Sequence, residues 1–130
     1  LDQRISVAYT YGQNTVKDEP LPEISPLDFR YSLNGSFFNG KLRPVISLRH
    51  VTKQGRISID YGESETPAFT LLDINLTYRI SKIISTTAGI QNLLNENYYE
   101  HLNRTIGGTT PTEIFAPGRN IFLSVTLDLN

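Results

Sequence analysis

Hydrophobic and polar residues alternate with a period of two along most of this chain. The clearest run is the last, where Ile121, Leu123 and Val125 alternate with Ser124 and Thr126. A period of two places successive side chains on opposite faces of a β-strand, which predicts one apolar and one polar face. Six segments share the pattern: Arg4 to Gly12, Asp28 to Phe38, Leu42 to Thr52, Phe69 to Ile80, Ile83 to Leu94 and Ile121 to Asn130. We therefore predict an all-β chain of six strands.

The lengths of these segments and of their connections favour a membrane barrel. Each run has roughly 9 to 12 residues, which suits a tilted strand that crosses a bilayer, whereas strands of soluble proteins peak near 5–6. Long connections (13–27, 53–68 and 95–118) alternate with short ones (39–41 and 81–82). Outer-membrane barrels alternate in this way between extracellular loops and periplasmic turns. The pattern predicts an antiparallel up-and-down transmembrane β-barrel, and alternating Ile57, Ile59 and Tyr61 predict that the third strand continues above the membrane.

Aromatic residues of the proposed outward faces lie near the two ends of the strands. Tyr9, Tyr11, Phe29 and Tyr31 lie near the long loops, and Phe37 and Tyr78 near the short turns. Aromatic girdles around an aliphatic band are typical of proteins that meet both membrane–water interfaces. We predict that the lipid-facing surface includes Leu72, Ile74, Leu76, Ile84, Ala88, Ile90, Leu123, Val125 and Leu127. By the same reasoning Tyr98 and Tyr99 are expected at the headgroup level, where the fifth strand leaves the membrane.

Composition limits the class of protein further. Twelve basic and 13 acidic residues give the 130-residue chain a net charge of −1, which argues against a nucleic-acid surface. Cysteine is absent, which excludes disulfides and thiolate metal sites. The chain starts at Leu1 without a signal segment, so we expect a mature portion or a fragment of a longer protein.

Two stretches resemble the C-terminal end of TonB-dependent outer-membrane receptors. They are "TPAFTLLDINLTYRISKIISTTAGIQNLLNENYYEH" and "APGRNIFLSVTLDLN". The shared features are a Pro-led strand that ends in an aromatic residue, a tight turn, an Asn-Leu strand end, a nearby Tyr, and Pro-Gly-Arg before the last strand. The residues that carry them are Pro67, Asp73, Tyr78, Asn92, Leu93, Tyr98, Pro117, Gly118 and Arg119. The likeness covers about Val7 to Leu129.

This resemblance implies a barrel of 22 strands whose lumen is filled by an N-terminal plug domain. Residues 1–130 would then be the C-terminal segment of that barrel, its last six strands, with the plug outside this chain. The resemblance also implies the outer membrane of a Gram-negative bacterium and uptake of a scarce nutrient, above all a ferric siderophore, powered by the TonB–ExbB–ExbD complex. The expected partners are outer-membrane lipid, the plug, the remaining strands and the ligand. Because such barrels usually end in an aromatic residue, we also expect the natural protein to continue one residue beyond Asn130.

No sequence motif of a hydrolase, a nucleotide-binding loop or a zinc protease occurs, so we predict no enzyme, no catalytic residue, no cofactor and no metal site. Charged residues on the polar faces (Arg30, Arg43, Arg49, Asp73 and Arg79) are expected to line the lumen and to pair there. Some of them can instead contact an anionic ligand, since guanidinium suits carboxylate and catecholate oxygens. Acidic loop residues such as Glu63 and Glu65 can bind a cation, but such residues are usually solvated, which is what we expect here. The ligand candidates are Tyr98, Tyr99, His101, Arg104, Arg79 and Arg49.

Two other functions fit parts of the pattern. A passive porin or channel would have similar strands, and it is distinguished by the lack of a plug domain. A soluble all-β binding module would instead cover the outward positions Ile74, Leu76 and Val125 with a second sheet.

Overall fold

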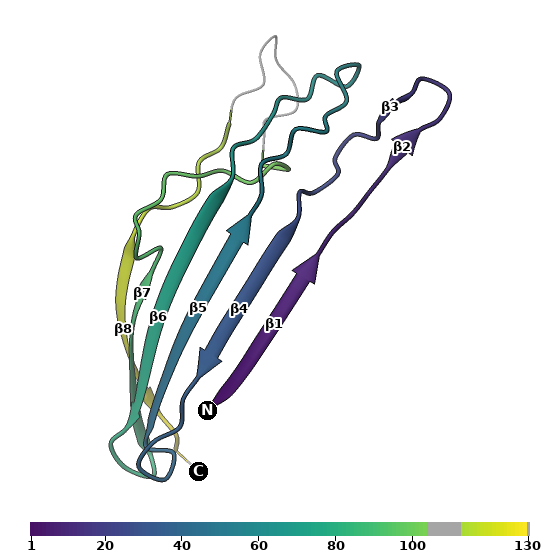
Figure 1. Ribbon diagram of the computed structural model, residues 1–130. Helices are drawn as coiled ribbons and strands as arrows, with labels where there is room; N and C mark the ends of the chain where they lie inside the picture. The colour runs from purple at the N-terminus through teal and green to yellow at the C-terminus, as the bar shows by residue number, and fades with distance from the viewer. Residues whose placement is uncertain (104–112, 130) are drawn as a thin grey trace.

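The computed structural model describes residues 1–103 and 113–129, and its main element is one antiparallel sheet (Figure 1). The six predicted strands are present, and each pairs with the next along the chain, which confirms the up-and-down arrangement. In sheet order they are β1 (Asp2–Ala8), β4 (Asp28–Asn34), β5 (Leu42–Val51), β6 (Phe69–Arg79), β7 (Ile84–Gln91) and β8 (Asn120–Leu127). Two short strands that the alternation did not predict, β2 (Gln13–Asn14) and β3 (Glu19–Pro20), pair within the first long connection. Within the described residues, no helix has the length and apolar character needed to span a membrane.

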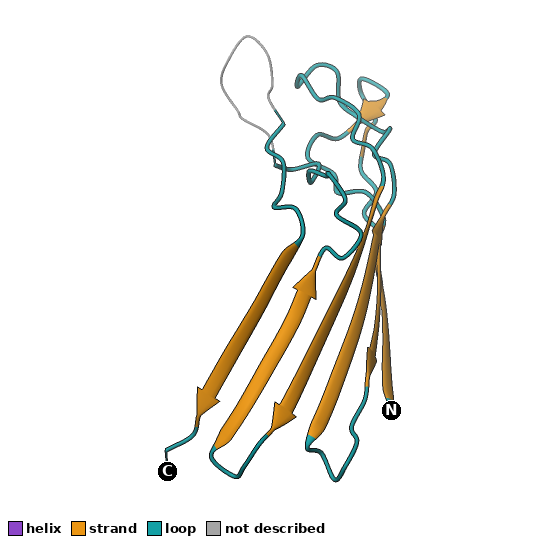
Figure 2. Cartoon of the chain, turned by 90° about the vertical axis from the view of Figure 1, so that its left-hand side faces the viewer, coloured by secondary structure: helices purple, strands orange, loops and turns teal. Residues whose placement is uncertain are grey.

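The long connections gather at one end of the sheet, and both chain ends lie at the other, with the short turns (Figures 1 and 2). We name the long connections loop 1 (9–27), loop 2 (52–68) and loop 3 (92–119, of which 104–112 are not described). The sheet does not close, because β1 and β8 each pair with only one neighbour. Free backbone edges are unfavourable in lipid, so the membrane form of this sheet requires additional strands on both edges.

The predicted continuation of the third strand through Ile57, Ile59 and Tyr61 is wrong. The chain turns between Ser58 and Glu63, where the Glu63 amide donates to the Ser58 carbonyl oxygen at 3.1 Å. The Glu63 carboxylate in turn accepts a hydrogen bond from the Ser58 amide at 2.8 Å, which fixes the turn. The alternation was therefore no strand signal, and Ile59 and Tyr61 are exposed on the turn.

The predicted apolar face is confirmed by the strand register. Five residues pair in succession across five neighbouring strands and form one continuous row: Leu33, Ile46, Ile74, Ile90 and Ile121. The next row towards the short turns contains Leu76, Ala88 and Leu123. In the described part of the chain no second sheet covers this face, and Ile74, Leu76 and Val125 are exposed. This arrangement contradicts the soluble-module alternative and fits a surface that contacts lipid.

An arginine on the apolar face is expected to destabilise the barrel far more than one on the opposite face. In the complete barrel, Ile74→Arg should lower the free energy of unfolding by about 2–4 kcal/mol, because it places a charge near the bilayer midplane. Asn75→Arg is the matched control, since the neighbouring residue faces the polar side. Urea unfolding in lipid vesicles measures both. Equal losses for the two variants would show that the faces are assigned wrongly.

The polar face contains one close packing site, where Gly89 of β7 lies opposite Phe122 of β8. A methyl group at Gly89 would overlap the Phe122 ring and the Asn75 side chain. Gly89→Ala is therefore expected to cost about 1–3 kcal/mol of unfolding free energy, the usual penalty of overpacking. Gly55→Ala serves as the control in the same measurement, because its nearest neighbour would lie at an ordinary 3.5 Å. A loss no larger than that of the control would contradict the packing.

Candidate functional site

A cluster of charged residues lies on the polar face, at the end of the sheet nearest the long loops. Arg30 of β4 and Arg49 of β5 are register partners. Both bind Asp28: Arg30 through Nε at 3.1 Å and Nη2 at 2.9 Å, and Arg49 through Nε at 3.0 Å and Nη2 at 2.8 Å. Alternation along the two strands puts these side chains on the face opposite the apolar rows, which confirms that face for both arginines.

Loop 3 folds over this polar face and adds a second carboxylate to the cluster. Glu100 binds Arg49 through both carboxylate oxygens, with Nη1 donating to Oε1 and Nη2 donating to Oε2 at 3.1 Å. Such two-pronged pairing of guanidinium with carboxylate is the strong and directional form of an ion pair. Arg49 thus joins the wall of the sheet to loop 3.

The aromatic residues of loop 3 also fold inwards. The Tyr98 ring packs on buried Phe69 with a centroid distance of 4.5 Å, and the Arg49 guanidinium lies 5.5 Å from the centroid of the same Phe69 ring. Burial, and secondarily the charge of Glu100, raises the pKa of Tyr98. Tyr98 therefore packs on the polar face of the sheet, and its place at the headgroup level stays a prediction. Tyr99 packs edge-on against Phe115 at 5.2 Å, and burial raises its pKa too.

A buried carboxylate, Glu63 of loop 2, connects all three long loops. Its oxygens accept hydrogen bonds from the Glu23 amide of loop 1 at 2.7 Å and from the Ser58 amide of loop 2. The His101 Nε2 atom of loop 3 lies 3.6 Å from Glu63 Oε1, and both side chains are almost wholly buried. His101 Nδ1 is also 2.8 Å from the Thr66 hydroxyl oxygen. The expectation that Glu63 is solvated is wrong, because the three loops pack around it.

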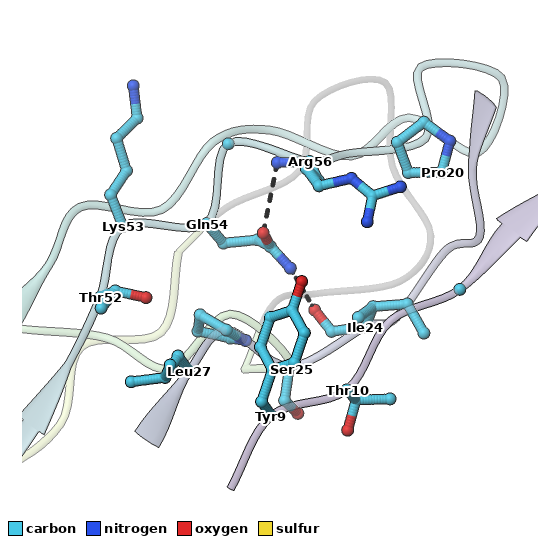
Figure 3. Close-up of a pocket in the computed structure, with 13 residues that line it drawn as sticks. Tyr9, Thr10, Pro20, Ile24, Ser25, Leu27, Thr52, Lys53, Gln54 and Arg56 are labelled. Atoms are coloured by element: carbon cyan, nitrogen blue, oxygen red, sulfur yellow. Dashed lines mark hydrogen bonds between the residues drawn. The ribbon is translucent and has the colours of Figure 1, made fainter. Parts of the chain in front are cut away.

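Loops 1 and 2 enclose a cavity of about 220 Å³ on the side nearer β1 (Figure 3). Gln54 crosses between the loops there, and its amide donates to the Ile24 carbonyl oxygen while its own oxygen accepts from the Arg56 amide. The Arg56 guanidinium stacks on Tyr11 of loop 1, with 3.8 Å between Cζ and the ring centroid. The Lys17 ammonium of loop 1 donates a hydrogen bond to the Asp60 carboxylate of loop 2, and this bond raises the pKa of Lys17. The loops therefore form one connected layer above the sheet.

Two further hollows lie on either side of Arg49. The larger hollow has a volume of about 480 Å³ and lies against the strands of the sheet. The residues that line it include Arg4, Arg30, Ser47 and Asp73. The smaller, about 170 Å³, lies under loop 3 and includes Asp28, Glu100 and His101. Arg49 lines both. This cluster with its two hollows is the candidate ligand site.

The structure brings three of the six predicted ligand residues together: Arg49, Tyr98 and His101 meet where loop 3 covers the sheet. Arg79 lies at the other end of β6, eight residues beyond the register partner of Arg49, or about 26 Å along the strand. Arg104 lies outside the described residues, as does Asn130. Ligand contact by any of the six stays a prediction. Sequence reasoning missed Asp28 and Glu100, and it expected Glu63 to be solvated.

The sequence matches the family described as TonB dependent receptor-like, β-barrel, over residues 2–93. The chain belongs to this TonB-dependent receptor family. A solved structure of similar fold, titled "Copper transporter OprC", superposes with a TM-score of 0.84 at 27% sequence identity. That match covers 96% of this chain but only 21% of the OprC chain, and none of the curated proteins matches. The family and the fold place this chain in the outer membrane of Gram-negative bacteria.

Two sequence motifs, Asn-Leu at 92–93 and Pro-Gly-Arg at 117–119, lie in the connection between β7 and β8. Asn92 is buried just after β7, and its backbone amide donates a hydrogen bond to Asp73 Oδ1 at 2.8 Å. Its side chain pairs with the Glu96 backbone and lies 3.5 Å from the Pro117 carbonyl oxygen. Asn95 Oδ1 accepts from the Arg119 amide at 3.1 Å. The Asn-Leu and Pro-Gly-Arg motifs therefore meet in space and close the base of loop 3.

The described residues contain no group of three or more histidine or acidic side chains arranged to hold a metal ion. The charged cluster instead consists of guanidinium groups and carboxylates that neutralise one another. Guanidinium cannot be deprotonated in a protein and presents planar pairs of donors, so this arrangement can bind oxyanions. Both the family and OprC are receptors or transporters, not enzymes.

Proposed function

We propose that this chain is the C-terminal segment of the barrel of a receptor that takes up a scarce nutrient in a TonB-dependent manner. The observation that carries the proposal is the family match, which spans residues 2–93. The open edges of β1 and β8 support it, since the remaining strands of a barrel would pair with both. A plug domain within the lumen and the TonB–ExbB–ExbD complex are the partners that this function requires.

A ferric siderophore is the substrate class we propose. The polar face supports it, because Arg4, Arg30 and Arg49 line one hollow together with serine hydroxyls. Siderophore complexes present carboxylate or catecholate oxygens, which guanidinium groups bind well. Copper is the second candidate, favoured by the likeness to OprC. The chain contains no Met and no Cys, the soft ligands that suit Cu(I), so its own residues favour the first candidate.

A comparison of iron and copper uptake between cells that lack the gene and cells that carry it decides between these two substrates. With radioactive iron supplied as siderophore complexes, the gene should restore uptake, and deletion of TonB should abolish it. Uptake that persists without TonB would indicate the passive channel instead. Restoration of copper accumulation without any effect on iron would favour the second candidate.

Single cysteines in the complete receptor test the orientation in the membrane. Tyr61→Cys, exposed on loop 2, should react with a membrane-impermeant maleimide on intact cells. Lys41→Cys, in the turn between β4 and β5, should react only after the outer membrane is opened. This chain has no cysteine of its own to interfere. The reverse pattern of labelling would invert the topology.

A further inference from the structure

Arg49 is shared by two carboxylates that differ in how firmly they are held. Asp28 belongs to β4, its side chain is 16% exposed, and it binds Arg30 as well as Arg49. Glu100 belongs to loop 3, its side chain is 36% exposed, and both of its side-chain hydrogen bonds within the described residues go to Arg49. Because ion pairs weaken with exposure, Glu100 is the partner that can exchange.

The surroundings of Arg49 favour an anion as the replacement. The larger hollow, on the sheet side of Arg49, is lined by three arginines and one acid, Asp73. Among the described residues, the ion-pair partner of Arg4 is the distant and exposed Asp2, at 3.9 Å. The hydroxyls of Ser6, Ser32 and Ser47 add donors that can bind oxyanions. An oxyanion in this hollow would lie within reach of the Arg49 guanidinium, to which Glu100 is bound.

We propose that Glu100 is a built-in competitor for the ligand, and that an oxyanion of the ligand replaces it on Arg49. The ligand class is one that presents two coplanar oxygens, as a carboxylate, a catecholate or a phosphate does, because the Arg49 fork already binds such a pair in Glu100. The exchange releases the segment around Glu100 from the polar face of the sheet, which couples binding to a movement of that segment. This inference rests on the proposed uptake function and adds to it the ligand chemistry and the contact that senses the ligand.

Competition predicts that removing the Glu100 charge improves anion binding. In the purified complete receptor, Glu100→Gln should bind inorganic phosphate about tenfold more tightly than the unchanged protein, because a charge-assisted hydrogen-bond pair no longer has to be displaced. Titration followed by phosphorus NMR line broadening at constant ionic strength measures the affinity. The double variant Glu100→Gln with Arg49→Gln should lose the gain. If that variant does not fold, Arg49→Lys replaces Arg49→Gln, since it keeps the charge without the fork.

An unchanged affinity in Glu100→Gln would overturn the proposal, and so would a gain that persists without the Arg49 fork. A spin label on Leu102→Cys provides the second measurement, because Leu102 is exposed and lies two residues from Glu100. Phosphate should increase the mobility of the label in the otherwise unchanged receptor, and Glu100→Gln should show high mobility without phosphate. A label that stays equally immobile in Glu100→Gln would show that the pair does not hold the loop. Both measurements use purified protein, so a failure of TonB-dependent uptake in cells would be recognised separately.

Discussion

Glu63→Ala is expected to open the loop layer at a cost of about 3–5 kcal/mol. The substitution leaves the buried Glu23 and Ser58 amides without their acceptor and removes the carboxyl group that lies beside His101. Unsatisfied buried donors cost about 1–3 kcal/mol each, so the two amides account for the expected loss. Hydrogen exchange of the peptide that contains Ser58 measures the effect, because opening of the layer exposes its amide to solvent.

Glu65→Ala is the matched control for this prediction. Glu65 lies two residues away in the same loop, but it pairs with Lys53 at 2.6 Å where both side chains are more than half exposed. Exposed pairs contribute at most about 1 kcal/mol, so exchange near Ser58 should change little. Peptides around His101 should also exchange faster in Glu63→Ala, since His101 packs against the same carboxylate. Equal exchange in the two variants would mean that Glu63 does not hold the loops together.

The contrast between Glu63 and Glu65 shows what the sequence could reveal. The strands, their order and their faces were predictable from the sequence. When the two faces of a strand meet an apolar and a polar environment, successive residues alternate in polarity, as Ile74 and Asn75 do. The loop layer has no such period. The bond between Glu63 and the Glu23 amide joins residues 40 positions apart in irregular segments, and no local pattern distinguishes it from the solvated Glu65. Burial in the loops is decided by tertiary packing alone.

The candidate site was predictable to the extent that its residues belong to strands. Arg49 was assigned to the polar face by alternation, and the structure agrees. The packing of Tyr98 on Phe69 was not predictable, because Asn92 and Asn95 adopt the left-handed conformation at φ +49° and +54°. Such residues redirect the chain, so the side-chain parity of β7 does not carry into loop 3. Glu100 was missed for the same reason: the inward fold of loop 3 brings it to Arg49.

The left-handed conformation of Asn92 leads to the second large expected effect. The Asn92 side chain donates to the Glu96 carbonyl oxygen at 2.9 Å and accepts from the Glu96 amide at 2.8 Å. Asn92→Ala removes both bonds in a buried position, which costs about 2–3 kcal/mol. It also forces a residue with a Cβ and no local hydrogen bond into a left-handed backbone, which adds about 1–2 kcal/mol. The expected total loss of unfolding free energy is about 3–5 kcal/mol.

Asn92→Gly separates these two contributions, because glycine adopts the left-handed conformation without strain but lacks the side-chain bonds. It should lose only the first part, about 2–3 kcal/mol. Urea unfolding of the complete barrel in lipid vesicles measures both variants against the unchanged protein. Equal losses for alanine and glycine would show that backbone strain at residue 92 is negligible. If neither variant loses stability, the Asn92 bonds do not close the base of loop 3.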